Sequence, residues 1–188
     1  MIRSFLAIDL PEIIKEEIGL YIKEFQKVPS QVKWVSPRQI HLTLKFFGSI
    51  PLDTVEKISR TLEKNVRKCP RFHLAMKGIG AFPNLFRPRV IWTGLQGDSP
   101  KLRALHQEIE AALVSLGIPR EERPFHPHLT LGRNKSTQIN EPLYKILAGW
   151  PAKESPPFPV QELILFKSDL KPNGPTYTKL GIFPLQEI

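Results

Sequence analysis

Apolar residues recur at helical spacing in four stretches of the chain. The first stretch follows Pro11, a residue that suits the opening turn of a helix, and it ends before Pro29. Its apolar positions, all expected on one face of the helix, are Ile14, Ile18, Tyr21, Ile22 and Phe25. The same spacing predicts helices over residues 53–66 and 99–116, and a shorter helix over residues 140–147.

Shorter apolar runs, bounded by Gly, Pro, Asp or Asn, predict β-strands between these helices. The predicted strands are Ile2–Ile8, Gln31–Val35, Ile40–Phe47, Phe72–Ile79, Val90–Leu95, one that begins at His128, Val160–Phe166 and Tyr177–Phe183. Several strands follow one another directly, which favours antiparallel pairing over a doubly wound parallel sheet and predicts an α+β fold. We expect a proline-rich extended loop over residues 151–159, a turn at Asn173–Pro175, and one domain over residues 1–188 because no linker interrupts the chain.

The sequence His-Leu-Thr-Leu occurs twice, at residues 41–44 and 128–131, nearly half the chain length apart. Side chains of a strand alternate between its two faces, so the histidine and the threonine of each copy point away from the leucines. The two copies therefore predict two similar lobes that face each other. The polar side chains between the lobes are then His41, Thr43, His128 and Thr130. The alternative is ordinary strand sequence in which each histidine is a hydrogen-bonded structural residue.

The net positive charge of the chain predicts an anionic partner. A net charge of +9 and a pI near 9.8 exceed what solubility requires, and nucleic acid is the leading candidate. The alternative is a lysine-rich surface that only solvates the protein. The single cysteine, Cys69, excludes an intrachain disulfide. We find neither a signal-peptide core nor a run of membrane-spanning length, so we expect a cytoplasmic protein with no membrane partner.

Two facing histidines can divide into a neutral base and a protonated acid, because the unperturbed imidazole pKa is about 6.5. This division suits in-line displacement at phosphorus: one imidazole takes a proton from water while the other protonates the departing oxygen. The hydroxyls of Thr43 and Thr130 can bind phosphate oxygens, and arginines can neutralise the developing charge. A strained cyclic phosphate requires only these groups, so we expect no metal and no cofactor.

Other reaction classes lack their motifs in this chain. There is no Gly-x-x-x-x-Gly-Lys loop for a P-loop nucleotidase, and no Gly-x-Ser-x-Gly elbow for a serine nucleophile. Cys69 precedes Pro70 and has no neighbour that marks a nucleophile. The two repeated histidines lack the carboxylate-rich or cysteine-rich surroundings of a metal site.

The repeated motifs and their flanks resemble the RNA 2′,3′-cyclic phosphodiesterase family, once called 2′-5′ RNA ligases, within the two-histidine phosphoesterase superfamily. The residues that carry the resemblance are 5–11, 41–48, 87–92 and 124–133. The resemblance implies a bilobed fold of two pseudo-symmetric halves around a central cleft. It also implies metal-independent hydrolysis of a terminal 2′,3′-cyclic phosphate of RNA to a 2′-phosphate. His41 would then protonate the leaving 3′ oxygen, and His128 would accept a proton from water.

Arginines near the motifs are candidates for phosphate contacts. Arg133 follows the second motif, as in the family, yet strict alternation places it on the leucine face of its strand. A bulge or a strand end near Gly132 would free it to turn toward the histidine face. Arg87 and Arg89 either bind backbone phosphates of RNA or only solvate their loop.

Aromatic residues after the first motif are candidates for base stacking. Phe47 shares the face of His41, and stacking on aromatic rings is a usual way to hold single-stranded RNA. Phe46 is expected in the core, and core packing is the alternative for Phe47 as well. His126 lies between two prolines and is interpreted as structural.

Three functions follow from these observations. The first is hydrolysis of the cyclic phosphate, and the second is the reverse reaction, which joins such an end to a 5′-hydroxyl as a 2′-5′ bond. The third is a non-catalytic RNA-binding module, against which the intact motifs argue. The expected partner is an RNA with a 2′,3′-cyclic phosphate terminus, tRNA fragments included, and we expect a monomer.

Overall fold

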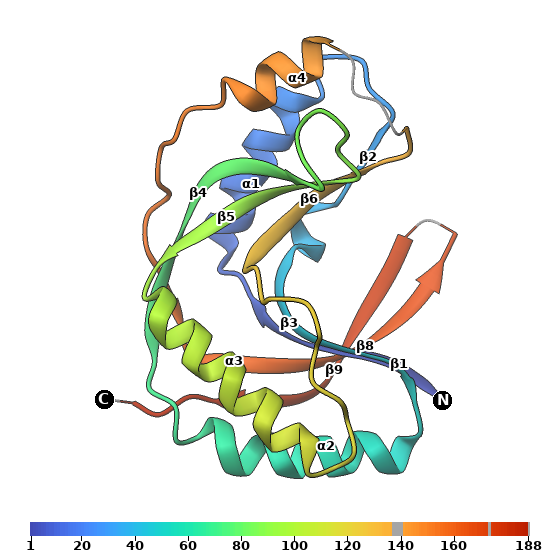
Figure 1. Cartoon of the computed structure of the whole chain (residues 1–188), viewed down its shortest axis with the longest axis vertical. Helices are drawn as coiled ribbons and strands as arrows, with labels where there is room; N and C mark the ends of the chain where they lie inside the picture. The colour runs from blue at the N-terminus through green and yellow to red at the C-terminus, as the bar shows by residue number, and fades with distance from the viewer. Residues whose placement is uncertain (137–140, 173, 188) are drawn as a thin grey trace.

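Two antiparallel β-sheets oppose each other in the computed structural model, which describes residues 1–136, 141–172 and 174–187 (Figure 1). The first sheet has the strand order β3-β1-β8-β9, and the second has the order β2-β6-β5-β4-β7. The strands of the first sheet are β1 (Ile2–Asp9), β3 (His41–Ile50), β8 (Glu162–Lys171) and β9 (Gly174–Pro184). Those of the second are β2 (Val32–Trp34), β4 (Phe72–Phe82), β5 (Val90–Gly97), β6 (His128–Asn134) and β7 (Phe158–Val160). The predicted α+β class with two antiparallel sheets is confirmed.

Helices cover the outer faces of both sheets (Figure 1). They are α1 (Glu12–Phe25), α2 (Leu52–Val66), α3 (Ser99–Val114) and α4 (Glu141–Ala148), and one 3-10 turn, η1, spans Pro37–Gln39. Helices α2 and α3 lie under the first sheet, whereas α1 and α4 pack against the second. The predicted stripe of α1 is buried at four of its five positions, and Tyr21 is half-buried.

The leucines of both repeats anchor their strands in the core. Leu42, Leu44, Leu129 and Leu131 are all buried in one cluster that contains residues of both sheets. Burying a leucine side chain contributes roughly 1.5–3 kcal/mol, so these four residues hold each motif strand with its histidine face turned away from the helices.

Several strands, among them β4, β8 and β9, extend beyond their predicted ends because backbone pairing continues where the apolar pattern stops. Strand β4 continues to Phe82, and β8 and β9 form a long hairpin in which Lys171 pairs with Gly174. The predicted proline-rich loop contains the short edge strand β7, which pairs with β4; an edge strand tolerates Pro159 because one side of it makes no ladder bonds. Asn140 and Asn173, in a predicted helix and a predicted turn, lie outside the described residues.

Within the described part of the chain, no helix is long and apolar enough to cross a membrane.

Candidate active site

The two motif strands line a single cleft between the sheets. Its volume is about 460 Å³, and its lining includes five of the six residues predicted for the site. These five are His41, Thr43, His128, Thr130 and Arg133. The sheets thus bring together side chains that are far apart in the sequence, as the repeated motif predicted.

A β-bulge in β6 turns Arg133 toward the cleft. Thr130 and Gly132 pair with consecutive residues of β5, so Leu131 between them has no partner on β5. One extra residue reverses the alternation of side chains beyond it. Arg133 therefore shares the face of His128, and of the two alternatives, a bulge or a strand end near Gly132, the structure has the bulge.

Strand β3 has a bulge at the equivalent position, which the sequence did not reveal. Thr43 and Lys45 pair with consecutive residues of β1, so Leu44 is the extra residue. Beyond the bulge Phe46 faces the cleft and is 58% exposed, whereas Phe47 packs against the core. The expected core position of Phe46 is therefore wrong, and Phe47 takes the alternative of core packing, because strict alternation does not hold across the bulge.

Each motif histidine makes the same kind of hydrogen bond, from its ring to the backbone carbonyl two residues earlier. Nδ1 of His41 lies 2.8 Å from the carbonyl oxygen of Gln39, and Nδ1 of His128 lies 2.6 Å from that of His126. A carbonyl oxygen only accepts, so Nδ1 carries the hydrogen in each ring. Nε2 is then the nitrogen that holds a lone pair in the neutral imidazole and donates a proton in the imidazolium.

Aromatic rings surround each imidazole and limit its rotation. His41 stacks on Phe5 with ring centroids 4.6 Å apart, and the edge of Tyr177 contacts it at 5.3 Å. His128 meets Phe82 edge-on at 5.0 Å and lies 6.2 Å from Trp92. These ring contacts exclude water from part of each imidazole, and both histidines are half-buried.

Burial lowers the pKa of both histidines below the ordinary value. For His41, the hydrogen bond to Gln39 and the Asp9 carboxylate oppose the effect of burial. For His128, the hydrogen bond to His126 opposes it, but the charges of the His126 ring and Arg133 lower the pKa further. The charges near His41 act in opposite directions, since Asp9 raises its pKa and Lys15 lowers it, whereas those near His128 both favour the neutral ring.

A pH profile tests this arrangement. An acid–base pair is active when one imidazole is protonated and the other neutral, so kcat/KM peaks midway between the two pKa values of the free protein. Since both values are lowered, we expect the maximum of kcat/KM below pH 6.5. A bound phosphate favours both imidazolium forms, so the maximum of kcat should lie at higher pH than that of kcat/KM. Coincident maxima above pH 7 would contradict this prediction.

The β8–β9 hairpin and two cations complete the cleft. Gln39 donates through Nε2 to the carbonyl oxygen of Pro175, at 2.5 Å, and so connects the turn before β3 to the hairpin tip. Lys33 and Arg133 are partners across β2 and β6, both are exposed, and neither makes an ion pair with any described residue. They leave positive charge available for a phosphate. Gln39, Lys33 and Tyr177 carry no motif that would have marked them in the sequence.

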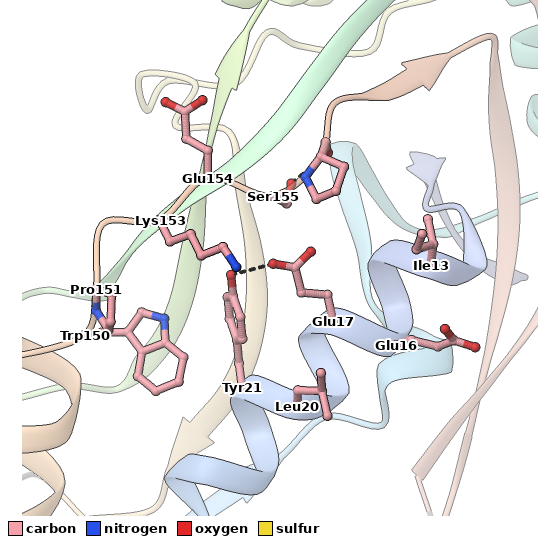
Figure 2. A pocket seen from close by; sticks show the side chains of 11 residues that line it. Ile13, Glu16, Glu17, Leu20, Tyr21, Trp150, Pro151, Lys153, Glu154 and Ser155 are labelled. Carbon is pink, nitrogen blue, oxygen red and sulfur yellow. Dashed lines mark hydrogen bonds between the residues drawn. The ribbon is translucent and has the colours of Figure 1, made fainter.

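A larger hollow of about 740 Å³ lies between α1 and the segment that follows α4 (Figure 2). Its lining contains no histidine, and its tyrosine, Tyr21, donates a hydrogen bond to Glu17 at 2.9 Å. Burial, together with Glu17, raises the pKa of Tyr21 to about 12, so this hydroxyl is no base at neutral pH. Nor do the described residues contain a cluster of three His, Cys, Asp or Glu side chains that could hold a metal ion.

Comparisons with known proteins identify the family of the chain. The family model of the 2′-5′ RNA ligase superfamily matches residues 15–172. The RNA 2′,3′-cyclic phosphodiesterase of Methanothermobacter thermautotrophicus is 32% identical over 98% of this chain and 99% of its own length. That of Methanocaldococcus jannaschii is 35% identical over 93% of this chain and 96% of its own length.

Solved structures show the same fold. A Thermus thermophilus protein superposes with a TM-score of 0.79 at 30% identity, covering 98% of both chains. Escherichia coli LigT, in a crystal structure with 3′-AMP, superposes with a TM-score of 0.78 at 26% identity, also covering 98% of both chains.

Proposed function

The chain belongs to the 2′-5′ RNA ligase superfamily, and we propose that it is an RNA 2′,3′-cyclic phosphodiesterase that opens the cyclic phosphate with water. The observation that carries this proposal is the matched pair of histidines. Both rings line one cleft, both are fixed through Nδ1, and both leave Nε2 for proton transfer. The cleft thus contains an acid and a base of the same chemical type, as a displacement at phosphorus requires.

In the proposed reaction, water attacks phosphorus in line with the bond to the 3′ oxygen. Nε2 of neutral His128 takes a proton from this water as the new P–O bond forms. The P–O3′ bond breaks, and protonated His41 donates its Nε2 proton to O3′. The products are a 2′-phosphate and a 3′-hydroxyl. The charge beside His128 supports its role as the base, because Arg133 favours the neutral ring, while Asp9 and Lys15 shift the pKa of His41 in opposite directions.

The remaining groups of the cleft bind the substrate in this proposal. Thr43 and Thr130 lie beside the histidines and donate to the non-bridging phosphate oxygens, where Arg133 adds positive charge. Phe46 replaces Phe47 as the ring on which a terminal base stacks, because it is exposed in the cleft. No step needs a metal ion or another cofactor.

Ligation is the second candidate, favoured by the name of the matching family. A 5′-hydroxyl that takes the place of water at the same phosphorus would give a 2′-5′ bond with the same two histidines. Incubation with paired tRNA halves that carry a cyclic phosphate and a 5′-hydroxyl tests this candidate, because ligation must yield a longer RNA. We further propose that the chain acts as one bilobed domain and a monomer in the cytoplasm, where tRNA fragments are among its substrates.

Turnover in the presence of a chelator tests the proposed function. An RNA oligomer that ends in a 2′,3′-cyclic phosphate should lose its cyclic end when incubated with the protein and EDTA. The same oligomer with a linear 3′-phosphate is the control and should not change. If the RNA binds with a steep salt dependence but is never turned over, the chain is an RNA-binding module instead.

A further inference from the structure

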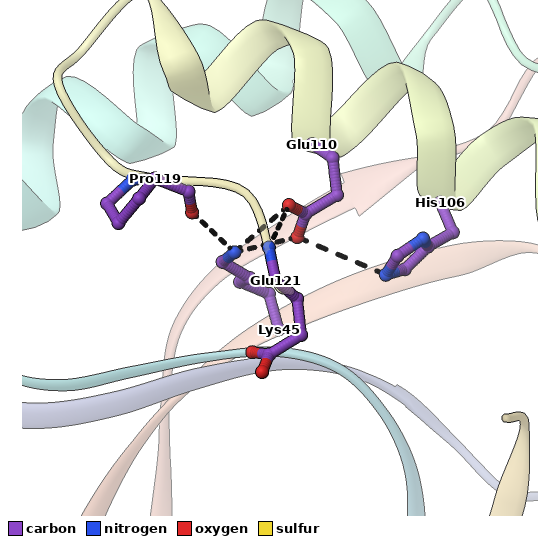
Figure 3. Close-up of polar contacts among 5 residues, drawn as sticks. All are labelled: Lys45, His106, Glu110, Pro119 and Glu121. Atoms are coloured by element: carbon purple, nitrogen blue, oxygen red, sulfur yellow. Dashed lines mark hydrogen bonds and ion pairs between the residues drawn. The ribbon is translucent and has the colours of Figure 1, made fainter. Parts of the chain in front are cut away.

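A buried ion pair connects the first motif strand to helix α3 (Figure 3). Lys45 and Glu110 are each only 6% exposed. Nζ of Lys45 lies 2.8 Å from Oε1 and 3.1 Å from Oε2 of Glu110. Removing two charges from water costs about as much free energy as their attraction returns, so an apolar pair would stabilise this position as well. Stability alone therefore does not account for the pair.

The same two side chains hold the segment between α3 and β6. Nζ of Lys45 donates to the carbonyl oxygen of Pro119 at 2.8 Å, and the backbone N–H of Glu121 donates to Oε2 of Glu110 at 2.9 Å (Figure 3). Each charge thus has one partner in the pair and one in the segment. The segment is fixed to the buried pair by its own backbone.

A second contact holds the far end of this segment. The ring of Phe125 stacks on His106 of α3, with centroids 3.9 Å apart and an angle of 4° between the planes. His106 also hydrogen-bonds the backbone of Leu44 and lies 4.0 Å from Oε1 of Glu110. Both anchors of the segment therefore rest on the bulge of β3, at Leu44 and Lys45.

The anchored segment leads directly into the second motif. Phe125 is followed by His126, whose carbonyl oxygen receives the Nδ1 hydrogen of His128. A displaced segment would move this carbonyl and with it the ring of His128. The ion pair is also close to the first motif. Lys45 lies two residues after Thr43 and one before Phe46, both of which line the cleft.

We propose that Lys45 and Glu110 are positioning residues, which set the place of His128 relative to the first motif through the segment from Pro119 to His126. The proposal rests on the proposed function, because it gives His128 a catalytic role. Neither Lys45 nor Glu110 lines the cleft, so each would act through the segment. It explains why two charges are kept where an apolar pair would serve stability. A misplacement of about 1 Å at a catalytic group can lower a rate by roughly 10²-fold.

A double variant separates positioning from stability. Lys45→Met/Glu110→Leu replaces the ion pair with apolar side chains and removes both hydrogen bonds to the segment. We expect it to keep a melting temperature near that of the wild type, but to lose about 10-fold or more in kcat, with KM changed much less. The matched control is Lys77→Met/Glu154→Leu, which removes an exposed pair of the same kind, at 2.9 Å, and should leave kcat unchanged.

Nuclear magnetic resonance of His128 gives a readout that does not require activity. In the wild type, the hydrogen-bonded Nδ1 proton should exchange slowly with water, and the ring nitrogens should report the Nδ1–H tautomer. The double variant should lose this slow exchange. This signal tests positioning even if the wild type turns over no cyclic phosphate, so failure of the proposed function is recognised separately.

Phe125→Ala is the second variant, used if the double variant does not fold. It removes the stacking on His106 but leaves the ion pair intact, and Phe125 is only half-buried. We expect the same loss in kcat and the same faster exchange at His128. A folded variant of either kind that keeps both the wild-type kcat and the slowly exchanging Nδ1 proton would overturn the proposal.

Discussion

Replacement of His128 by alanine is expected to lower kcat for cyclic-phosphate hydrolysis by about 10²- to 10⁴-fold, the usual contribution of one positioned acid or base. The variant keeps the fold, because the ring of His128 faces the cleft while Leu129 and Leu131 anchor the strand. The remaining groups still bind phosphate, so KM should change much less than kcat. Steady-state kinetics on a cyclic-phosphate oligomer measure both constants.

The matched control is His73→Ala. His73 is an exposed histidine of β4 whose backbone N–H donates to the Asp98 carboxylate and whose backbone carbonyl accepts from the N–H of Asp98. Its replacement should leave kcat within about 2-fold of the wild type. If His128→Ala retained most of the wild-type kcat, water would have to be activated by a group other than this imidazole.

Replacement of Lys45 alone by methionine is expected to give the largest loss of stability. The carboxylate of Glu110 would remain buried without its ammonium partner, and breaking a buried pair in this way typically costs about 3–5 kcal/mol. That loss is a large share of the roughly 5–15 kcal/mol by which native proteins are stable. Urea denaturation of the two proteins, compared at equal m-values, measures the difference.

Two comparisons make this prediction specific. Lys77→Met removes a partner of the exposed pair with Glu154 and should cost less than about 1 kcal/mol. Adding Glu110→Leu to Lys45→Met should restore most of the lost stability, since no unpaired charge then remains in the core. A loss below about 1 kcal/mol in Lys45→Met would mean that water reaches Glu110 and that the pair is not held as described.

The sequence predicted those features that depend on local periodicity. The stripes of α1 and α2 are buried as expected, since one apolar face per helix leaves one way to pack. The repeated tetrapeptide predicted two strands whose leucines are buried and whose histidines share one cleft. Alternation along a strand sufficed for this because the histidine and threonine of each motif precede the bulge, which lies at the last leucine of the motif.

Features that depend on pairing between distant strands could not be predicted from the sequence alone. The bulge at Leu44 is defined by its register with β1, and it alone decides that Phe46 and not Phe47 faces the cleft. One signal was available: Phe46 follows His41 by the same number of residues as Arg133 follows His128, so a bulge expected in one motif should have been expected in both.

The buried ion pair could not be predicted from local periodicity or from the repeated motif. Lys45 continues an apolar strand, and Glu110 lies within the apolar stripe of α3, so each reads by itself as an exception to the pattern. Each charge is compensated by the other and by a hydrogen bond to the segment between α3 and β6, and these partners lie far from Lys45 in the chain.

The position of the phosphate in the product tests the central claim most directly. Wild type and His41→Ala are incubated, with EDTA, with an RNA oligomer that ends in a 2′,3′-cyclic phosphate, and the 2′- and 3′-phosphate products are resolved. Protonation of the 3′ oxygen by His41 predicts a 2′-phosphate alone from the wild type, and a rate lower by about 10²-fold or more from His41→Ala. A 3′-phosphate product, or equal rates from the two proteins, would contradict the assignment of the two histidines.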